Sequence, residues 1–374
     1  MAHGHSHAHA PTGFSVPRWL HATFLLLAAL TLAALVATWP TSELPSAPAA
    51  YEQVPARISR SQASPCGVNE CVTVLAQVPS GAEISLGQVS ARSPLGRLSP
   101  GTAVVLGFED STNSYVYLDL DRRPQLLLLT GLFCLAVLLF ARLRGLRSLL
   151  ALSVSATLLF FYTAPALISG SSPVLVSLIT AATVILVSTT LTHGFSAPSQ
   201  VASIAMLLAL ISTWALTALV LPIFSFTGAL SEDVYLVRSL LPGIDLPGLV
   251  FGSILIGFVG ALDDVVLTQV AAVSELTGTA PRRAVFAAAM RIGRTHVSAS
   301  VNTLTMAYLS ASMPLLLFFA LSSASPGLLL SGEVLAVEVV RMFIGTLGLM
   351  VSVPLATALA TFATQSRVGI EPAN

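Results

Sequence analysis

The stretch that decides the fold runs from residue 257 to residue 305 and reads GFVGALDDVVLTQVAAVSELTGTAPRRAVFAAAMRIGRTHVSASVNTLT. It places two adjacent carboxylates, and then two arginines and a histidine, within long apolar segments. Ionisable groups are costly at membrane depth, where they face the bundle interior, pair with one another or line a wet cavity. The stretch therefore predicts a membrane protein and, within it, a functional site.

The composition of the whole chain supports a multi-span membrane protein. Of its 374 residues, 55% are hydrophobic and only 9% are charged, which is too apolar for an ordinary soluble domain. The net charge is zero, so no basic surface argues for nucleic acid. The sequence contains no HExxH, no GxSxG and no phosphate-binding glycine loop. We expect neither an enzyme nor a nucleic-acid-binding protein.

Apolar runs predict an α-helical polytopic protein of about eight transmembrane helices. The first run, residues 19–39, is bracketed by tryptophans and lacks an A-x-A-like site after it, which favours an anchor over a signal peptide. The other spans are expected at residues 125–141, 148–168, 173–191, 200–221, 248–272, 297–320 and 334–362.

Between the first two spans the chain changes character. The pieces VTVLAQV, ISLGQV, TAVVLGF and YVYLDLD are separated by turn residues and predict a small all-β, barrel-like domain of roughly five strands. Asp119 and Asp121 are expected on the solvent face of its last strand. Cys66 and Cys71 are expected to form a small-loop disulfide. The predicted parts are a His-rich tail at 1–18, an anchor at 19–39, the β domain at 41–123, a seven-helix core at 124–363 and a C-terminal tail at 364–374.

Arginines in short loops set the expected orientation. Three of them share the loop at 142–147, and Arg282 and Arg283 share another, all on one side if there are eight spans. We expect a multi-pass protein of the bacterial plasma membrane with both termini cytoplasmic and the β domain outside the cytoplasm.

Two polar stripes lie on successive helices of the opening stretch. Asp264, Thr268 and Glu275 share one helix face, and Asp263 is adjacent to it. We infer that this acidic stripe faces a cationic stripe on the next helix, which comprises Arg291, Arg294, Thr295, Ser298, Asn302 and Thr305.

Several other polar residues have plain structural explanations. His193 precedes Gly194 at a helix end, where helix capping explains both, and lining a path is a second role. His296 is either a proton relay or an interfacial histidine. Glu338 and Arg341 are spaced to pair within one helix. The tail residues His3, His5, His7 and His9 could collect a divalent metal ion weakly, although their spacing suits no fixed geometry.

The acidic pair supports three hypotheses. A carboxylate that pairs with arginine in one state and takes a proton in another suits an ion-coupled transporter of a small ion or solute, with Asp263, Asp264, Arg291 and Arg294 as the coupling site and Asp264 as the acceptor. The alternative is a non-transporting assembly or export-accessory protein, whose β domain binds a protein partner and whose polar stripes only hold helices together. An intramembrane hydrolase is the least favoured, because consecutive aspartates point about 100° apart on a helix.

Four pieces of the sequence resemble the YibE/F-like family of bacterial integral membrane proteins: LTHGF at 191–195, GALDDV at 260–265, RIGRTH at 291–296 and VNTLTMAY at 301–308. The resemblance extends from about residue 51 to 362 and implies a transporter or permease without naming its substrate. The same block is similar, more weakly, to RND-type permeases, in which intramembrane Asp and Arg carry proton coupling. The chain lacks the large paired periplasmic domains of those pumps.

Overall fold

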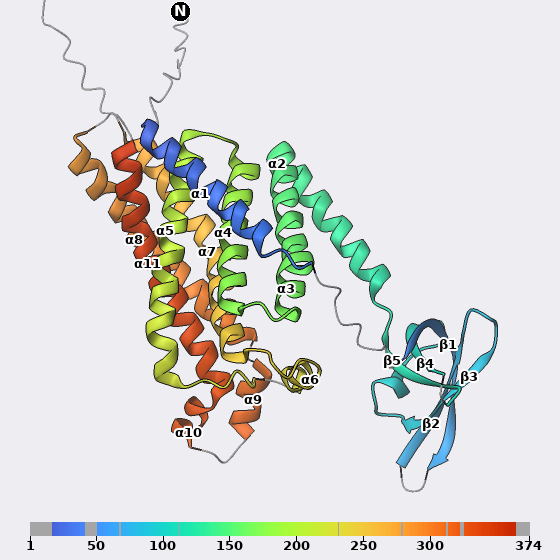
Figure 1. The fold of residues 1–374 in the computed structure, drawn as a ribbon. Helices are drawn as coiled ribbons and strands as arrows, with labels where there is room; N and C mark the ends of the chain where they lie inside the picture. The colour runs from blue at the N-terminus through green and yellow to red at the C-terminus, as the bar shows by residue number, and fades with distance from the viewer. Residues whose placement is uncertain are drawn as a thin grey trace, which may run out of the picture. The chain divides into compact units, whose positions relative to one another are not determined.

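The structure is a computed structural model that describes residues 17–41, 51–66, 69–110, 112–230, 232–277, 280–311, 313–321 and 325–363. The chain divides into two compact units. One comprises residues 1–44 and 146–374 and is helical, whereas the other comprises residues 45–145 and contains the β strands (Figure 1). The tail histidines 3, 5, 7 and 9 lie outside the described residues.

The β unit is one curled antiparallel sheet with the strand order β3-β2-β1-β4-β5. Alternate residues face inward and form its core, which is built around Ile58, Val74 and Leu106. Parts of β3 and β5, the two ends of the sheet, approach each other, but the described hydrogen-bonded order is that of an open sheet. The elements are β1 Glu52–Cys66, β2 Asn69–Gln77, β3 Glu83–Ser90, the 3₁₀ turn η1 Leu95–Arg97, β4 Ala103–Glu109 and β5 Ser114–Leu120.

The cysteines of the chain differ in state. Cys71 in β2 is disulfide-bonded, and Cys134 in the following helix is a free thiol. The side chain of Cys66, the expected partner of Cys71, lies outside the described side chains. The backbone of β1 pairs Cys66 with Asn69 across a tight hairpin.

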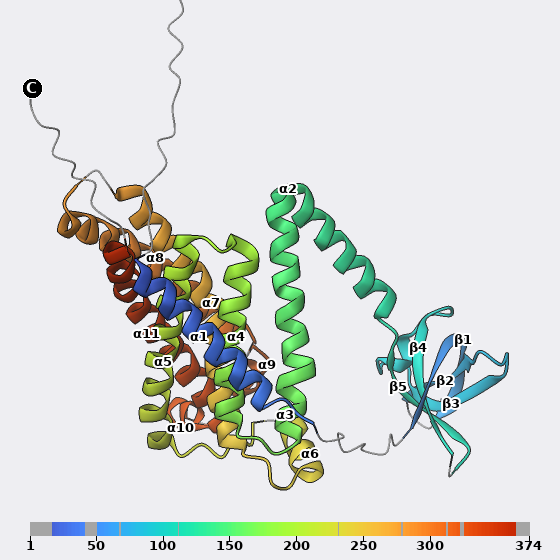
Figure 2. The same cartoon turned by 45° about the horizontal axis from the view of Figure 1, so that its top comes forward.

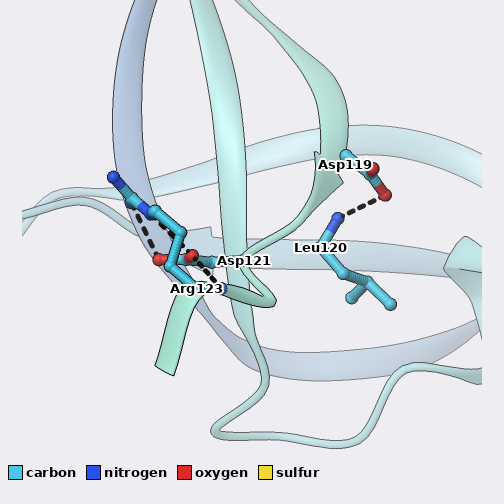
Figure 3. Close-up of polar contacts among 4 residues, drawn as sticks. All are labelled: Asp119, Leu120, Asp121 and Arg123. Carbon is cyan, nitrogen blue, oxygen red and sulfur yellow. Dashed lines mark hydrogen bonds and ion pairs between the residues drawn. The ribbon is translucent and has the colours of Figure 1, made fainter. Parts of the chain in front are cut away.

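Ion pairs join the last strand to helix α2 (Arg123–Leu158). Asp121 accepts bonds from Nε and Nη2 of Arg123, both at 2.8 Å, and from the Arg123 backbone N–H at 3.1 Å (Figure 3). Asp119 accepts from the backbone N–H of Leu120 at 2.7 Å and from Nη1 of Arg122 at 2.8 Å. The first of these bonds lowers the pKa of Asp119, and the Arg123 guanidinium lowers the pKa of Asp121. Only 14% of the Asp121 side chain is exposed, less than the expected solvent face implied.

Helix α2 breaks at Arg142, whose φ of 52° and ψ of −128° are not helical. The break separates the two expected spans 125–141 and 148–168. A π-helical turn, η2 (Leu159–Thr163), and α3 (Ala164–Ile168) continue the second segment. The unit that holds the strands reaches Gly145, beyond the expected boundary at residue 123, since the first half of α2 continues directly from β5.

The helical unit is organised around α7, which packs against four helices, namely α4, α5, α8 and α11 (Figures 1 and 2). Asp245 caps α7 by accepting from the Gly248 N–H at 2.9 Å, and Pro247 occupies its first turn. The helices are α1 Arg18–Ala37, α4 Pro173–His193, α5 Ala197–Phe224, α6 Glu232–Leu240, α7 Leu246–Leu276, α8 Arg282–Ala311, α9 Met313–Leu321, α10 Pro326–Ser331 and α11 Glu333–Ala363.

Helix α1 packs against α4 and α5. His21 bonds the buried amide of Gln200 at 2.9 Å, and Phe24 meets Phe195 edge-on with ring centroids 5.2 Å apart. At its other end, the Thr38 hydroxyl bonds the hydroxyl of the fully buried Tyr162 in η2 at 2.6 Å. The predicted anchor is therefore a packed element of the helical unit.

Six helical stretches among the described residues are long and apolar enough to cross a membrane, the pattern of a multi-pass membrane protein. The expectation was eight. Two expected spans fall within one stretch, Arg123–Ile168, and the expected span 297–320 falls on α8 and α9, outside the six. Charged and polar side chains along the whole of α8, among them Arg291, Arg294 and Asn302, make it less apolar than the six. The six stretches are Arg18–Ala37, Arg123–Ile168, Pro173–His193, Ala197–Phe224, Leu246–Leu276 and Glu333–Ala363.

Candidate functional site

The two aspartates of α7 occupy different environments. Asp263 is partly buried, and its Oδ1 atom is buried without a hydrogen-bond partner. The side chain of Asp264 is 79% exposed. Consecutive residues of a helix point about 100° apart, so one carboxylate faces into the bundle while its neighbour turns outward.

A first cavity of about 420 Å³, called the α2–α4 cavity, is lined by the second half of α2, by η2, α4 and α7. Its wall is mainly apolar, with Leu159 and Val184 among the lining side chains. Six polar side chains also line it, those of Ser148, Ser155, Thr180, Ser188, Thr192 and Asp263. The α2–α4 cavity thus brings one carboxylate to an otherwise largely apolar space.

The π-helical turn η2 fixes one wall of this cavity. Its Thr163 hydroxyl bonds the hydroxyl of Thr180 on α4 at 2.7 Å, and Thr180 lines the cavity. Tyr162 in the same turn stacks on Trp39 with ring centroids 5.5 Å apart. Single π turns within helices occur frequently at functional sites, and here the turn is held by contacts with both α1 and α4.

A second cavity of about 690 Å³, called the α4–α5 cavity, lies where α4 ends and α5 begins, against the second half of α7. Its polar lining includes the predicted residues Asp263, Asp264, His193, Thr268 and Glu275. Gly194, which ends α4, has a φ of 73°, a value that favours glycine. His193 is thus the last residue of α4, before Gly194, and it also lines this cavity.

Two residues, Gly260 and Asp263, line both cavities. A Cβ atom added at Gly260 would meet no other atom within 4 Å, because open space lies beside this helix turn. Two polar side chains of α4 interact with the Asp263 carboxylate: Ser188 through a hydrogen bond and His193 through its charge when it is protonated. Asp263 therefore stands at the place where the two cavities adjoin.

Helix α8 meets the acidic pair through a histidine. Nε2 of His296 lies 3.5 Å from Oδ2 of Asp264, close enough for an ion pair when the imidazole is protonated, but the geometry is not that of a hydrogen bond. Arg291 and Arg294 have no carboxylate within ion-pair distance among the described residues. The described contact between the acidic pair and α8 is thus made by His296, which is not a member of the inferred cationic stripe.

The remaining predicted residues of α8 lie apart from the two cavities. Ser298, Asn302 and Thr305 are on α8 and line neither of them. Ser298 and Asn302 are exposed, and Thr305 is partly buried.

Gln269, which follows GALDDV in the stretch that resembles the family, was given no role by sequence reasoning. Gln269 is 3% exposed, and its Nε2 donates to the Ala289 carbonyl at 2.9 Å and to the Thr357 hydroxyl at 2.7 Å. A Cβ atom at Gly293 would lie 2.5 Å from Val353 and 2.7 Å from Oε1 of Gln269. Gln269 therefore ties α7 to α8 and α11, and its position inside an apolar run was the available signal.

A metal site finds no support in the described chain. No group of three or more His, Cys, Asp or Glu side chains that could hold a metal ion occurs among the described residues. The only described acidic groups of the two cavities are Asp263, Asp264 and Glu275, and the tail histidines lie outside the described residues.

The comparisons with known proteins place the helical part of the chain. The family model described as YibE/F-like protein matches residues 129–366. The match covers both aspartates and all the helices that line the two cavities, whereas the β strands fall outside it. Comparison with curated proteins and with solved structures gives no match. The chain belongs to the YibE/F-like protein family.

Proposed function

We propose that the chain is an ion-coupled secondary transporter or permease of the plasma membrane, with the acidic pair of α7 as its coupling site. The observation that carries the proposal is that Asp263 and Gly260 line both cavities. A transporter needs a binding group that two compartments reach in turn, and transport sites lie near the bilayer midplane, beside irregular helices. Asp263 lies in the interior of α7, an apolar helix of 31 residues, and lines the α2–α4 cavity together with Leu159 of η2.

In this proposal Asp263 is the principal acceptor of the proton or cation. The sequence favoured Asp264 for that role, but Asp264 is largely exposed in the α4–α5 cavity, whereas Oδ1 of Asp263 is buried without a partner. A carboxylate with one oxygen buried and without a partner is less stable when charged and gains from binding a cation. Asp264 and His296 then form an entry relay on the side of the α4–α5 cavity.

Arg291 and Arg294 keep a second role. They have no carboxylate partner among the described residues in this state, so they are available to pair with Asp264 in another state. The placement of the arginines also supports the proposed orientation, with both termini and the α4–α5 cavity on the cytoplasmic side.

Ion flux in proteoliposomes tests the proposal. Wild type, Asp263→Asn and Asp264→Asn would be compared with a pH dye inside and an imposed ion gradient, and Asp233→Asn on α6 is the matched loss of an exposed carboxylate. We expect flux in wild type and Asp233→Asn, a loss of about tenfold or more in Asp263→Asn, and a smaller loss in Asp264→Asn. Equal flux in wild type and Asp263→Asn, with folded protein, would refute the coupling site.

One observation supports the alternative of a partner-binding protein. Strand β5 is an end strand of the sheet, and no described strand pairs with its outer edge. It carries the exposed side chains Val116 and Leu118, at 40% and 38% exposure. An unpaired edge can accept a strand from another protein. Replacing Val116 by Lys would abolish capture of a partner in this case while leaving ion flux unchanged.

A further inference from the structure

The α2–α4 cavity has the chemistry of a binding site for a small organic ligand. Its volume of about 420 Å³ falls within the usual range for ligand pockets, which are mainly apolar with a few placed polar groups. The lining side chains Leu152, Leu159, Ile185 and Val259 supply apolar surface, and Asp263 is the one acidic residue among the described lining residues.

The polar atoms around this cavity are arranged to accept hydrogen bonds. The Ser155 hydroxyl donates to the Ala151 carbonyl at 2.9 Å, and the Thr192 hydroxyl donates to the Ser188 carbonyl at 2.7 Å. Because these two hydroxyl protons are engaged within their own helices, the Ser155 and Thr192 oxygens present lone pairs to a ligand, while the Ser188 hydroxyl bonds the Asp263 carboxylate. The Oδ1 atom of Asp263 adds an acceptor that is buried and has no partner. No arginine, lysine or histidine is among the described lining residues.

A cavity that offers acceptors and one carboxylate selects a cation that carries N–H donors. A bare divalent metal ion would meet a single carboxylate here, since Asp263 is the one His, Cys, Asp or Glu side chain among the described lining residues. An anion would meet the carboxylate without any compensating charge. A neutral apolar molecule would leave Oδ1 of Asp263 unpaired.

We infer that the α2–α4 cavity binds a small organic amine in its protonated form, with the ammonium group at Asp263 and the apolar body against α2 and α4. The inference rests on the proposed function for the ligand's passage through the membrane, but binding at the cavity is a separate property. The charge-assisted bond to Asp263 sets the preference for the amine, and the apolar wall contributes affinity without charge selectivity.

Three ligands of one shape and different charge test this inference. Benzylamine is protonated at neutral pH, benzyl alcohol is neutral and benzoate is anionic. Binding to the full chain in detergent is measured by calorimetry at neutral pH. We expect benzylamine to bind about tenfold more tightly than benzyl alcohol, and benzoate to bind most weakly. Equal binding of benzylamine and benzyl alcohol would indicate an apolar slot, such as one for a lipid chain, and would overturn the inference.

Two variants locate the binding. Asp263→Asn is expected to remove the preference for benzylamine while keeping the binding of benzyl alcohol, and Val184→Phe is expected to weaken both by filling the cavity. Asp233→Asn, on exposed α6, keeps the wild-type pattern. Unchanged benzylamine binding in folded Val184→Phe protein overturns the inference even if Asp263→Asn fails to fold. Benzylamine binding without any ion flux would refute the proposed function and leave this inference standing. Ion flux with no preference for benzylamine would support the proposed function and overturn this inference.

Discussion

Charged groups lie beside or on helix α7 at two levels, a Glu338–Arg341 pair of α11 near its start and its own Asp263 further along, and the two levels differ in their surroundings. Near its start, Ser253 accepts from Nη2 of Arg341 at 2.9 Å, while Nη1 of the same arginine donates to both carboxylate oxygens of Glu338, at 2.8 and 3.0 Å. Ten residues further along, the Oδ1 atom of Asp263 has no partner, and cavities adjoin it on two sides.

The comparison indicates that a charged group in a membrane helix belongs to a functional site when it lines a cavity, and that it otherwise serves to hold helices together. The charges of Glu338 and Arg341 neutralise each other, and Arg341 also bonds a neighbouring helix, although its Nε atom is buried without a hydrogen-bond partner. Neither residue lines the two cavities, so we assign the pair the role of holding α11 against α7. The Asp263 level leaves a carboxylate oxygen unsatisfied beside empty space, which is costly for stability unless a ligand or proton is bound there.

The largest expected effect is on ion flux past Asp263, and it tests whether the two cavities form the transport path. Gly260→Leu would fill the space that Gly260 leaves beside Asp263, and we expect ion flux in proteoliposomes to fall about tenfold or more. Gly260→Ala is the matched control, since its Cβ meets nothing within 4 Å and alanine favours a helix over glycine by about 1 kcal/mol. Full flux in folded Gly260→Leu protein would show that the cavities do not form the path.

Substitutions in the Glu338–Arg341 pair should instead change the stability of the protein. Glu338→Gln leaves the Arg341 charge unpaired, and we expect a loss of about 2 kcal/mol in the free energy of unfolding, less than for a fully buried pair because the two side chains are 22% and 19% exposed. Glu338→Gln with Arg341→Met should recover most of this loss. Denaturant unfolding in detergent measures both. A double variant less stable than the single one would contradict the structural role.

A third prediction concerns the packing of α8 against α7 and α11. Gly293→Ala would press a methyl group on Val353 and Gln269, and we expect a loss of about 1–3 kcal/mol in stability. Gly345→Ala on α11 is the control, because its Cβ meets no atom within 4 Å. Comparison of the two unfolding midpoints checks this. Equal midpoints would mean that Gln269 and its neighbours shift without cost.

The smallest effect is expected in the β unit, where charges are paired in water. Asp121 has a lowered pKa because of Arg123, so its contribution to stability is present above its ordinary pKa and is lost as the pH falls through the lowered value. Arg123→Gln should return the pKa of Asp121 toward the ordinary value. NMR titration of labelled aspartate carboxyl groups in the full chain measures this shift. An unchanged pKa would show that the pair has no influence in solution.

Much of this arrangement could be predicted from the sequence. The pieces VTVLAQV, ISLGQV, TAVVLGF and YVYLDLD fall on β2, β3, β4 and β5, because alternation and turn residues are local signals. The family is confirmed over residues 129–366. The location of the acidic pair within a long helix also followed from the length of its apolar run.

The rest depends on packing that local patterns do not encode. The sequence shows that Asp263 and Asp264 diverge, but which of them lines both cavities depends on where α2 and α4 lie. The helix breaks at Arg142, where no glycine or proline in the sequence predicts a break. The residue type of Gln269 suits a polar stripe. Its burial becomes evident only from its hydrogen bonds to Ala289 of α8 and Thr357 of α11.

Access to residue 263 from both sides of the membrane tests the central claim most directly. Asp263→Cys, in a chain whose free Cys134 is replaced by Ala, would be labelled in oriented vesicles with a membrane-impermeant thiol reagent added to one side or the other. Ser253→Cys at the paired level serves as the comparison. The account predicts labelling of residue 263 from each side and little labelling of residue 253. Labelling of residue 263 from one side only, in folded protein, would contradict it.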